Sequence, residues 1–274
     1  MKKQLQQFTP KSRSLQLYFL LIFGTSAIIW LIGAVVEQLI PELPVTIPFS
    51  SLMFVSPIIA GCYCTYRENG FQGVKELLKK TFDYERVKGK VWYLPTFFLM
   101  PAVTGIQYGM LRLMHRPIPN TQISFSTLLV FPAIFFIAAI GEEVGWQGYA
   151  IDRLQARLNA LSASLLLGIV WAAWHVIPMI QMGQTPVWIM WQGINIAVTR
   201  ILIVWIYNNA GKSVFLAVLY HAMYNVCTML FPGYDPIIVT LTLIVLAAAI
   251  TIIWSPKTLA DYKYSASGKV TNPA

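Results

Sequence analysis

The stretch "LLVFPAIFFIAAIGEEVGWQGYA", residues 128–150, joins a long apolar run to two adjacent acids, Glu142 and Glu143. The run belongs to an apolar stretch over 123–146, and about 20 apolar residues are enough for a helix that crosses a membrane. Ionisable groups at membrane depth are costly, so their presence suggests a functional site. The rest of the chain decides whether these acids lie within a membrane.

The composition is that of an integral membrane protein. The chain has 274 residues, of which 57% are hydrophobic and 11% are charged, with a mean hydropathy of +0.61. Ordinary soluble domains are about 25% charged. Because no linker, low-complexity tract or fixed-period repeat divides the chain, we expect one transmembrane domain over 1–274.

Apolar stretches of membrane-spanning length predict about eight transmembrane helices. They cover residues 15–40, 48–66, 92–111, 123–146, 162–182, 186–207, 213–231 and 236–254. The first runs directly into "VVEQLIPELP" without a small-residue cleavage site, so it is predicted to be a retained helix and not a signal peptide. We therefore expect an all-α polytopic protein with its helices around an intramembrane cavity.

The net charge of +9 is explained by the distribution of the basic residues in the predicted topology. With eight spans and both termini cytoplasmic, 17 of the 20 Lys and Arg residues lie on the cytoplasmic side, as the positive-inside rule requires, and Arg200 alone lies within a span. We expect a multi-pass protein of the cell membrane and no nucleic-acid partner, which would need a clustered basic face. Residues 71–88, "FQGVKELLKKTFDYERVK", predict a cytoplasmic amphipathic helix on the lipid bilayer.

Three predicted spans bring further polar groups to the cytoplasmic half of the membrane. Glu142 ends the fourth span, His175 lies in "WAAWHVIP" of the fifth, and "LYHAMYN" of the seventh carries His221 and Asn225. The last two are four residues apart and share a helix face, whereas the neighbouring acids point about 100° apart. Each group alone has a structural interpretation, as an interhelical hydrogen bond or a snorkelling acid, but together they form a constellation.

These side chains fit the hydrolysis of a peptide bond. A carboxylate and an imidazole can activate water, and a second imidazole with an amide can donate to the oxyanion of a tetrahedral intermediate. Zinc is the alternative, held by Glu142, His175 and His221 with water in the fourth position. The helical signature His-Glu-x-x-His is absent from the sequence, and the residues leave both possibilities open.

The motifs "GEEVGWQGYAIDRLQ", "LLLGIVWAAWHVIP" and "LYHAMYN", between residues 141 and 225, resemble the CAAX protease and bacteriocin-processing (CPBP, or Abi) family of intramembrane proteases. That family shares a Glu-Glu-x-x-x-Arg, an aromatic-x-x-x-His and a His-x-x-x-Asn motif on about eight transmembrane helices. The resemblance implies that Glu142 activates water with His175, and that His221 and Asn225 donate to the oxyanion. It leaves metal dependence open.

One position departs from the family motif. The resemblance implies that Glu143 pairs with a residue four positions further on, and Gln147 stands there in place of Arg. Arg200 is the one cation within a span, and it has two interpretations. It can snorkel to the lipid headgroups, or it can turn inward and replace the motif arginine, since intramembrane charges usually pair inside the bundle.

The resemblance implies an intramembrane endopeptidase that cleaves a membrane-associated peptide or protein. Eukaryotic relatives remove the last three residues of prenylated CAAX proteins, and prokaryotic relatives act in bacteriocin processing or immunity. The alternative is a non-catalytic membrane protein, such as a bacteriocin-immunity factor, that uses the same fold. A proton-coupled transporter is a third possibility, but the sequence lacks the internal repeats usual in that class.

Overall fold

A computed structural model describes residues 12–39, 48–87, 89–119, 124–231, 233–260, 263–264 and 270–271. Five basic residues that contribute to the predicted orientation lie outside these ranges: Lys2, Lys3, Lys11, Lys88 and Lys269.

Helices account for almost all of the described chain, which confirms the predicted all-α class. The long helices are α1 (Ser12–Leu39), α2 (Val55–Lys79), α3 (Tyr93–Leu113), α4 (Phe125–Gly145), α6 (Ala160–Gln181), α7 (Pro186–Asn209), α8 (Val214–Leu230) and α9 (Pro236–Trp254). The short elements are 3₁₀ helices η1 (Phe49–Phe54), η2 (Lys80–Phe82), η3 (Tyr84–Arg86) and η4 (Lys90–Trp92), the π-helix η5 (Trp146–Ile151), α5 (Asp152–Gln155), and strands β1 (Lys263–Tyr264) and β2 (Val270–Thr271).

The described helices include six that are long and apolar enough to cross a membrane. These segments are Ser14–Val36, Phe49–Phe82, Phe125–Gln155, Ala160–Gln181, Pro186–Asn209 and Pro236–Trp254. The chain is thus a multi-pass membrane protein. Helix α8 is apolar but has only 17 residues, and α3 is not among the six. The predicted count of about eight spans therefore stays a prediction, although each predicted span coincides with a long helix.

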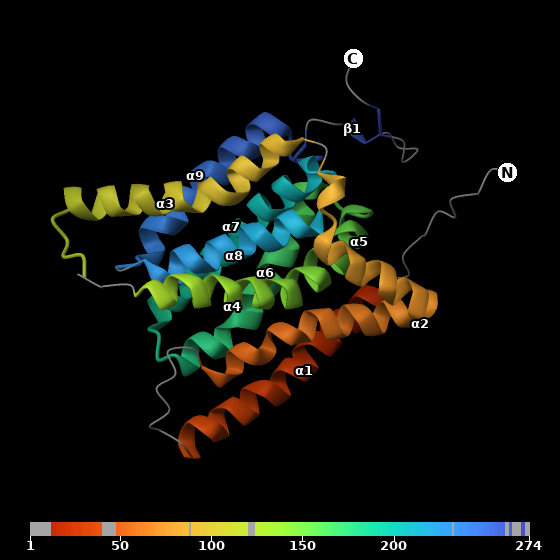
Figure 1. Ribbon diagram of the computed structural model, residues 1–274, viewed down its shortest axis with the longest axis horizontal. Coiled ribbons are helices and arrows are strands. Elements are labelled where there is room, and N and C mark those ends of the chain that lie inside the picture. The colour runs from red at the N-terminus through yellow and green to blue at the C-terminus, as the bar shows by residue number, and fades with distance from the viewer. Residues whose placement is uncertain are drawn as a thin grey trace.

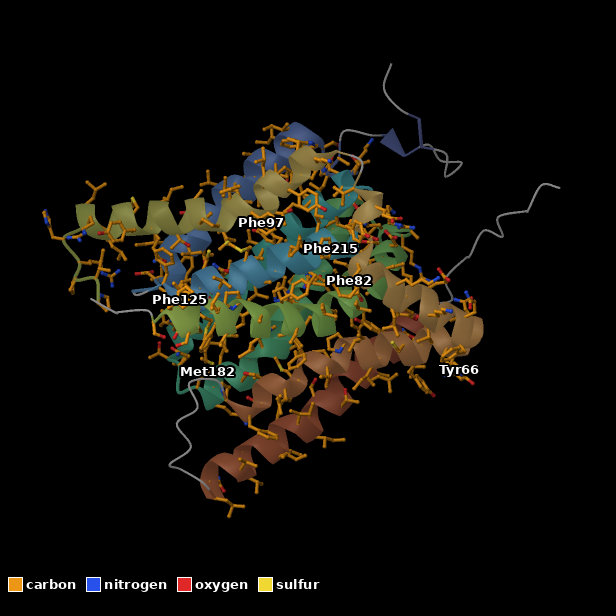
Figure 2. All side chains as sticks on the ribbon, viewed as in Figure 1. Tyr66, Phe82, Phe97, Phe125, Met182 and Phe215 are labelled. Atoms are coloured by element: carbon orange, nitrogen blue, oxygen red, sulfur yellow. The ribbon has the colours of Figure 1, made fainter. Side chains whose placement is uncertain are left out.

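The bundle is built around α4, α6, α7 and α8 (Figure 1). Helices α1 and α2 pack on one side, where α2 contacts α4, and α3 and α9 pack on the other, against α8 and α7. Phe125 and Met182 lie at one end of the bundle and Tyr66 at the other (Figure 2), as the predicted alternation of helix directions requires.

The four central helices, α4, α6, α7 and α8, begin at residues whose side chains cap them. Ser124, Asn159, Thr185 and Ser213 each accept a hydrogen bond from the backbone N–H three residues further on, at the starts of α4, α6, α7 and α8. Such caps satisfy backbone N–H groups that have no partner within the helix. Local sequence therefore sets where these helices start.

The end of α4 lies directly against α2. A Cβ added to Gly145 would collide with the carbonyl oxygen of Pro57, and one added to Gly141 would lie 2.7 Å from that of Phe54. Small residues let helix backbones approach closely within a membrane. The two glycines therefore fix the last turn of α4, which carries both acids.

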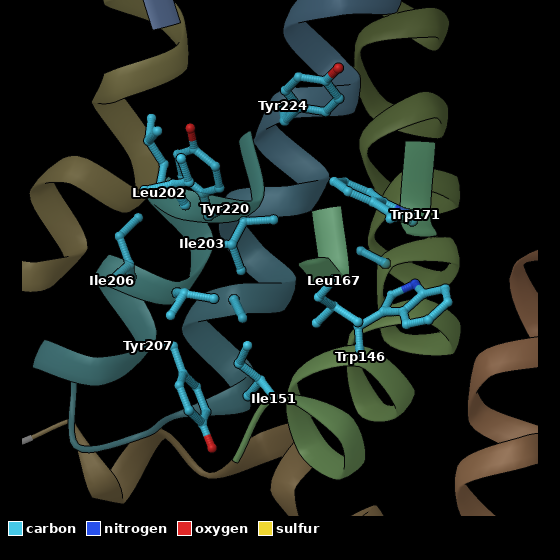
Figure 3. Close-up of a cluster of buried hydrophobic side chains, with 14 of the residues drawn as sticks. Trp146, Ile151, Leu167, Trp171, Leu202, Ile203, Ile206, Tyr207, Tyr220 and Tyr224 are labelled. Carbon is cyan, nitrogen blue, oxygen red and sulfur yellow. The ribbon is translucent and has the colours of Figure 1, made fainter. Parts of the chain in front are cut away.

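The core surrounds this turn and α7. Figure 3 shows Trp146 and Trp171 on one side of the cluster and Leu202 and Ile206 of α7 on the other. Of the apolar window in α7, 72% is buried inside the protein, a larger share than in any other candidate span of the described chain. Helix α7 is therefore the central helix, with protein on most of its faces.

The predicted amphipathic segment 71–88 is helical only in its first half. Helix α2 changes direction at Gly70, where φ is 63°, and then continues to Lys79. Two 3₁₀ turns follow, at Lys80–Phe82 and Tyr84–Arg86. The second predicted span therefore extends, through this kink, into the segment expected to lie on the membrane surface.

Candidate active site

The adjacent acids at the end of α4 are both buried, and they face different partners. Glu142 Oε2 accepts a hydrogen bond of 2.7 Å from Trp171 Nε1 on α6 and one of 3.4 Å from Trp146 Nε1. Glu143 lies between Arg200 of α7 and His221 of α8. The divergence expected for neighbouring helical residues is thus realised.

Glu143 is the centre of a buried ionic cluster. Arg200 Nη1 lies 2.7 Å from Glu143 Oε2, and His221 Nδ1 lies 2.9 Å from Glu143 Oε1. The side chains of Glu143 and Arg200 have no exposed surface. Of the two interpretations of Arg200, the one in which it turns inward and pairs is confirmed and the snorkelling one is wrong, because the guanidinium pairs with Glu143 inside the bundle.

Trp171 joins the two halves of the site. Its indole N–H bonds to Glu142, while the guanidinium carbon of Arg200 lies over its ring, 4.0 Å from the centroid. The same ring meets the His175 ring at 5.5 Å and the His221 ring at 5.0 Å, edge to face. A cation over an indole face is favourable, more so when it is desolvated. One tryptophan therefore contacts every charged or imidazole group of the site except Glu143.

The role of Trp171 was not predicted. The sequence places it four residues before His175, on the same helix face, and the aromatic-x-x-x-His motif marks its position. Neither signal indicates that its N–H reaches a carboxylate on another helix. That contact depends on how α4 and α6 are rotated toward each other.

His175 approaches the site through Trp171 rather than by bonding to an acid. Its Nδ1 lies 2.8 Å from the Trp171 carbonyl oxygen. A carbonyl can only accept, so Nδ1 carries the proton and Nε2 of a neutral ring keeps its lone pair. The ring is half-buried, against the indoles of Trp171 and Trp174. His175 therefore presents a basic nitrogen.

Asn225 lies on the same helix as His221, one turn further on, and is half-buried. Within the described chain, the Asn225 side chain makes no hydrogen bond to Glu142, Glu143, His175, His221 or Arg200. The structure therefore brings Glu143 and His221 into contact, places both imidazoles against Trp171, and leaves the Asn225 amide without a protein partner in the site.

Gln147, at the position of the motif arginine, makes no hydrogen bond to Glu143. Both atoms of its side-chain amide are buried without a hydrogen-bond partner among the described residues. The helix continues as a π-helix from Trp146 to Ile151. The pairing of Glu143 with residue 147 that the resemblance implies is therefore not formed among the described residues, and the positive charge beside Glu143 comes from Arg200.

The described residues do not gather into a metal site. No group of three or more His, Cys, Asp or Glu side chains among them could hold a metal ion. Glu142 Oε2 accepts from two indoles, and Nδ1 of each site histidine faces an oxygen acceptor, as the second ring nitrogen of a metal-ligating histidine usually does. None of the described hydrogen bonds involves Oε1 of Glu142 or Nε2 of either histidine, so zinc held by Glu142, His175 and His221 and metal-free water activation both stay open.

Comparison with known proteins adds independent information. Residues 124–227 match the family model described as type II CAAX prenyl endopeptidase Rce1-like. CAAX prenyl protease 2 of Methanococcus maripaludis is 29% identical over 270 residues, which span 92% of this chain and 96% of that relative. The matched region contains both acids, both site histidines, Asn225 and Arg200.

Proposed function

We propose that this chain, which resembles CAAX prenyl proteases over most of its length, is a membrane peptidase of that type and cleaves a peptide bond with water activated by Glu142 and His175. His221 and Asn225 would stabilise the oxyanion, and Glu143 with Arg200 would hold His221 in place. The substrate class is a membrane-associated, prenylated CAAX peptide or protein, by extension from the relative named a CAAX prenyl protease.

The different partners of the two acids are the observation that carries this assignment. Glu143 is held by Arg200 and His221 through both of its oxygens, so it is committed to positioning. Glu142 uses only Oε2, toward neutral indole N–H groups, which leaves Oε1 to accept a proton. One carboxylate thus fits the base and the other fits an orienting group.

In the proposed first step, Glu142 takes a proton from water while the water oxygen bonds to the scissile carbonyl carbon. Nε2 of His175 accepts the second O–H of the water and so orients it. The carbonyl oxygen becomes an oxyanion. Hydrogen-bond donors fixed in place before the reaction are the usual way to stabilise such a charge.

His221 can donate to that oxyanion only from Nε2, because its Nδ1 proton faces Glu143. The ring must therefore carry both protons before the step begins and keep them throughout, and the adjacent carboxylate stabilises this imidazolium. The amide N–H₂ of Asn225 is the second donor.

In the second step the C–N bond breaks and its electron pair stays on the amine nitrogen. Glu142 returns its proton to that nitrogen, so the products are a carboxylic acid and an amine. Every proton is supplied by water, and the side chains return to their starting states.

The alternative of a non-catalytic immunity factor is favoured only by Gln147, which stands in place of the motif arginine and brings no charge to Glu143. Arg200 now supplies a buried positive charge to Glu143, so this alternative has no specific observation in its favour.

The test uses the purified protein in detergent with a farnesylated peptide that ends in a CAAX sequence, and mass spectrometry to detect a new carboxyl terminus. Glu142→Gln and His175→Ala should each lower kcat by about 10² to 10⁴, while the protein still folds. Glu76→Gln, which changes an exposed acid of α2, is the matched control. Full activity of the Glu142 variant would overturn the mechanism.

A chelator arm tests the zinc alternative. Activity that survives a strong chelator supports the mechanism as written. Activity that is lost and then restored by zinc would contradict it and assign a metal to the site.

A further inference from the structure

The start of α8 is capped by a side chain that lies far away in the sequence. Asp83, between η2 and η3, accepts hydrogen bonds from Ser213 Oγ at 2.7 Å, Phe215 N at 3.1 Å and Val214 N at 3.3 Å. Ser213 Oγ in turn accepts from Leu216 N. The first backbone N–H groups of α8 are therefore all satisfied, and a carboxylate lies where the helix dipole favours one.

Other contacts fix the Asp83 segment to the same turn. Gly211 has a φ of 69°, and a Cβ at this position would collide with the carbonyl oxygen of Arg86. The rings of Phe82 and Tyr84 lie 6.3 and 6.4 Å from that of Phe215. Backbone and aromatic contacts thus surround the carboxylate on both sides.

The same segment reaches the helix that carries the acids. Lys80 Nζ donates a hydrogen bond of 3.0 Å to the carbonyl oxygen of Gly148, in the π-helix that continues α4. Residues 80–86, which we call the brace, therefore contact both the continuation of the Glu142–Glu143 turn and the start of the helix that carries His221. Neither contact involves Glu142, His175, His221 or Asn225, the residues proposed to act on the substrate.

The brace joins α8 to the continuation of α4, and the hydrogen bond between His221 and Glu143 links the same two helices. The length of that bond should therefore be sensitive to the brace. His221 lies about two turns, or ~10 Å at ~1.5 Å per residue, beyond the start of α8, and its Nδ1 must stay within 2.9 Å of Glu143. A misplacement of about 1 Å at a catalytic group can cost on the order of 10²-fold in rate. The end of α8 held by the brace is the end nearer His221.

We propose that Asp83 is a positioning residue of the peptidase, which sets the placement of α8, and thereby of His221 and Asn225, against the acids of α4. The activity readout of this inference rests on the proposed function. It assigns to the brace a role in turnover and not in substrate contact, since Asp83 bonds only to the start of α8.

The first arm measures kcat and KM for Asp83→Ala, Asp83→Asn and, as the matched control, Glu85→Ala. Glu85 is an exposed acid in the same brace, and none of the described hydrogen bonds involves its side chain. Asp83→Ala should lower kcat at least tenfold and change KM less than twofold. Asp83→Asn keeps a carbonyl acceptor for Ser213 and Phe215, so it should recover part of kcat, and Glu85→Ala should match the wild type. A wild-type kcat for Asp83→Ala, or a loss expressed only in KM, overturns the proposal.

The second arm does not depend on activity and separates this inference from the proposed function. Hydrogen exchange of the full-length protein in detergent should show that Asp83→Ala loses amide protection from Val214 as far as His221. Loss confined to Val214–Leu216 would mean that the cap is local, and would overturn the proposal even in an active enzyme. If the wild type cleaves no peptide, the proposed function fails, and this arm still decides whether Asp83 positions α8.

Discussion

Arg200 Nη1 lies 2.7 Å from Glu143 Oε2, and neither side chain has exposed surface. Within the described chain, Nε and Nη2 of this arginine have no hydrogen-bond partner, and its guanidinium is stacked on Trp171. The pair therefore combines a charge contact with a flat aromatic contact, a combination that arginine makes and lysine does not.

Removing this arginine should destabilise the protein. Arg200→Gln leaves the buried Glu143 carboxylate without its arginine counterion, and breaking a buried ion pair typically costs about 3–5 kcal/mol; it should also inactivate the site. Thermal unfolding in detergent and turnover measure the two effects. Arg200→Lys, which keeps the charge but loses the stacking, should give an intermediate result. A fully stable Arg200→Gln protein would contradict the assigned role.

Gln147→Arg, added to Arg200→Gln, should restore part of the stability and activity. The new arginine would occupy the motif position, where the present amide is buried without a partner among the described residues. The measurement compares the melting temperature and kcat of the double variant with those of Arg200→Gln alone. A double variant no better than the single one would show that an arginine at position 147 cannot replace Arg200 beside Glu143.

The hydrogen bond from Trp171 to Glu142 should be measurable in kcat. Trp171→Phe keeps an aromatic ring beside Arg200 but removes the N–H donor, and a hydrogen bond to a charged group contributes about 1.5–3 kcal/mol. We expect kcat to fall about tenfold to a hundredfold. Trp205→Phe is the matched control, because the Trp205 N–H is buried without a hydrogen-bond partner in the described structure. Equal effects of the two substitutions would rule out a specific role for Trp171.

Asn225→Ala should lower kcat by about 10² to 10³ if its amide donates to the oxyanion. KM should change little, because the charge exists only in the transition state and the tetrahedral intermediate. Thr228→Val is the control on the same helix, since the Thr228 hydroxyl bonds only to carbonyl groups of α8. Loss of binding without loss of kcat would assign Asn225 to substrate recognition instead.

Both termini are predicted to be cytoplasmic, because the basic residues gather on that side of the eight-span topology. Green fluorescent protein fluoresces in bacteria only when it is cytoplasmic. Fused after Ala274, it should therefore be fluorescent. A periplasmic reading from alkaline phosphatase at the same position would contradict the topology. It would also reverse the side from which the site is approached.

The sequence alone predicts the class, the positions of the helices and the candidate side chains. Hydropathy and capping residues are local properties, so the ranges of α4, α6, α7 and α8 can be read from neighbouring residues. The motif spacing places Glu142, His175 and His221 on three separate helices. These statements need no knowledge of which helix packs on which.

The partner of each side chain is decided by packing. Whether Arg200 turns toward Glu143 or toward lipid depends on the rotation of α7, which its neighbours fix on nearly every face. The bond from Trp171 to Glu142 requires α6 and α4 to face each other in one register, and the cap from Asp83 joins segments that are far apart in the chain. Likewise, that Glu143 pairs with Arg200 of α7 and not with Gln147 of its own helix depends on packing. Helix rotation and lateral order arise from contacts between distant segments, so only the tertiary structure determines them.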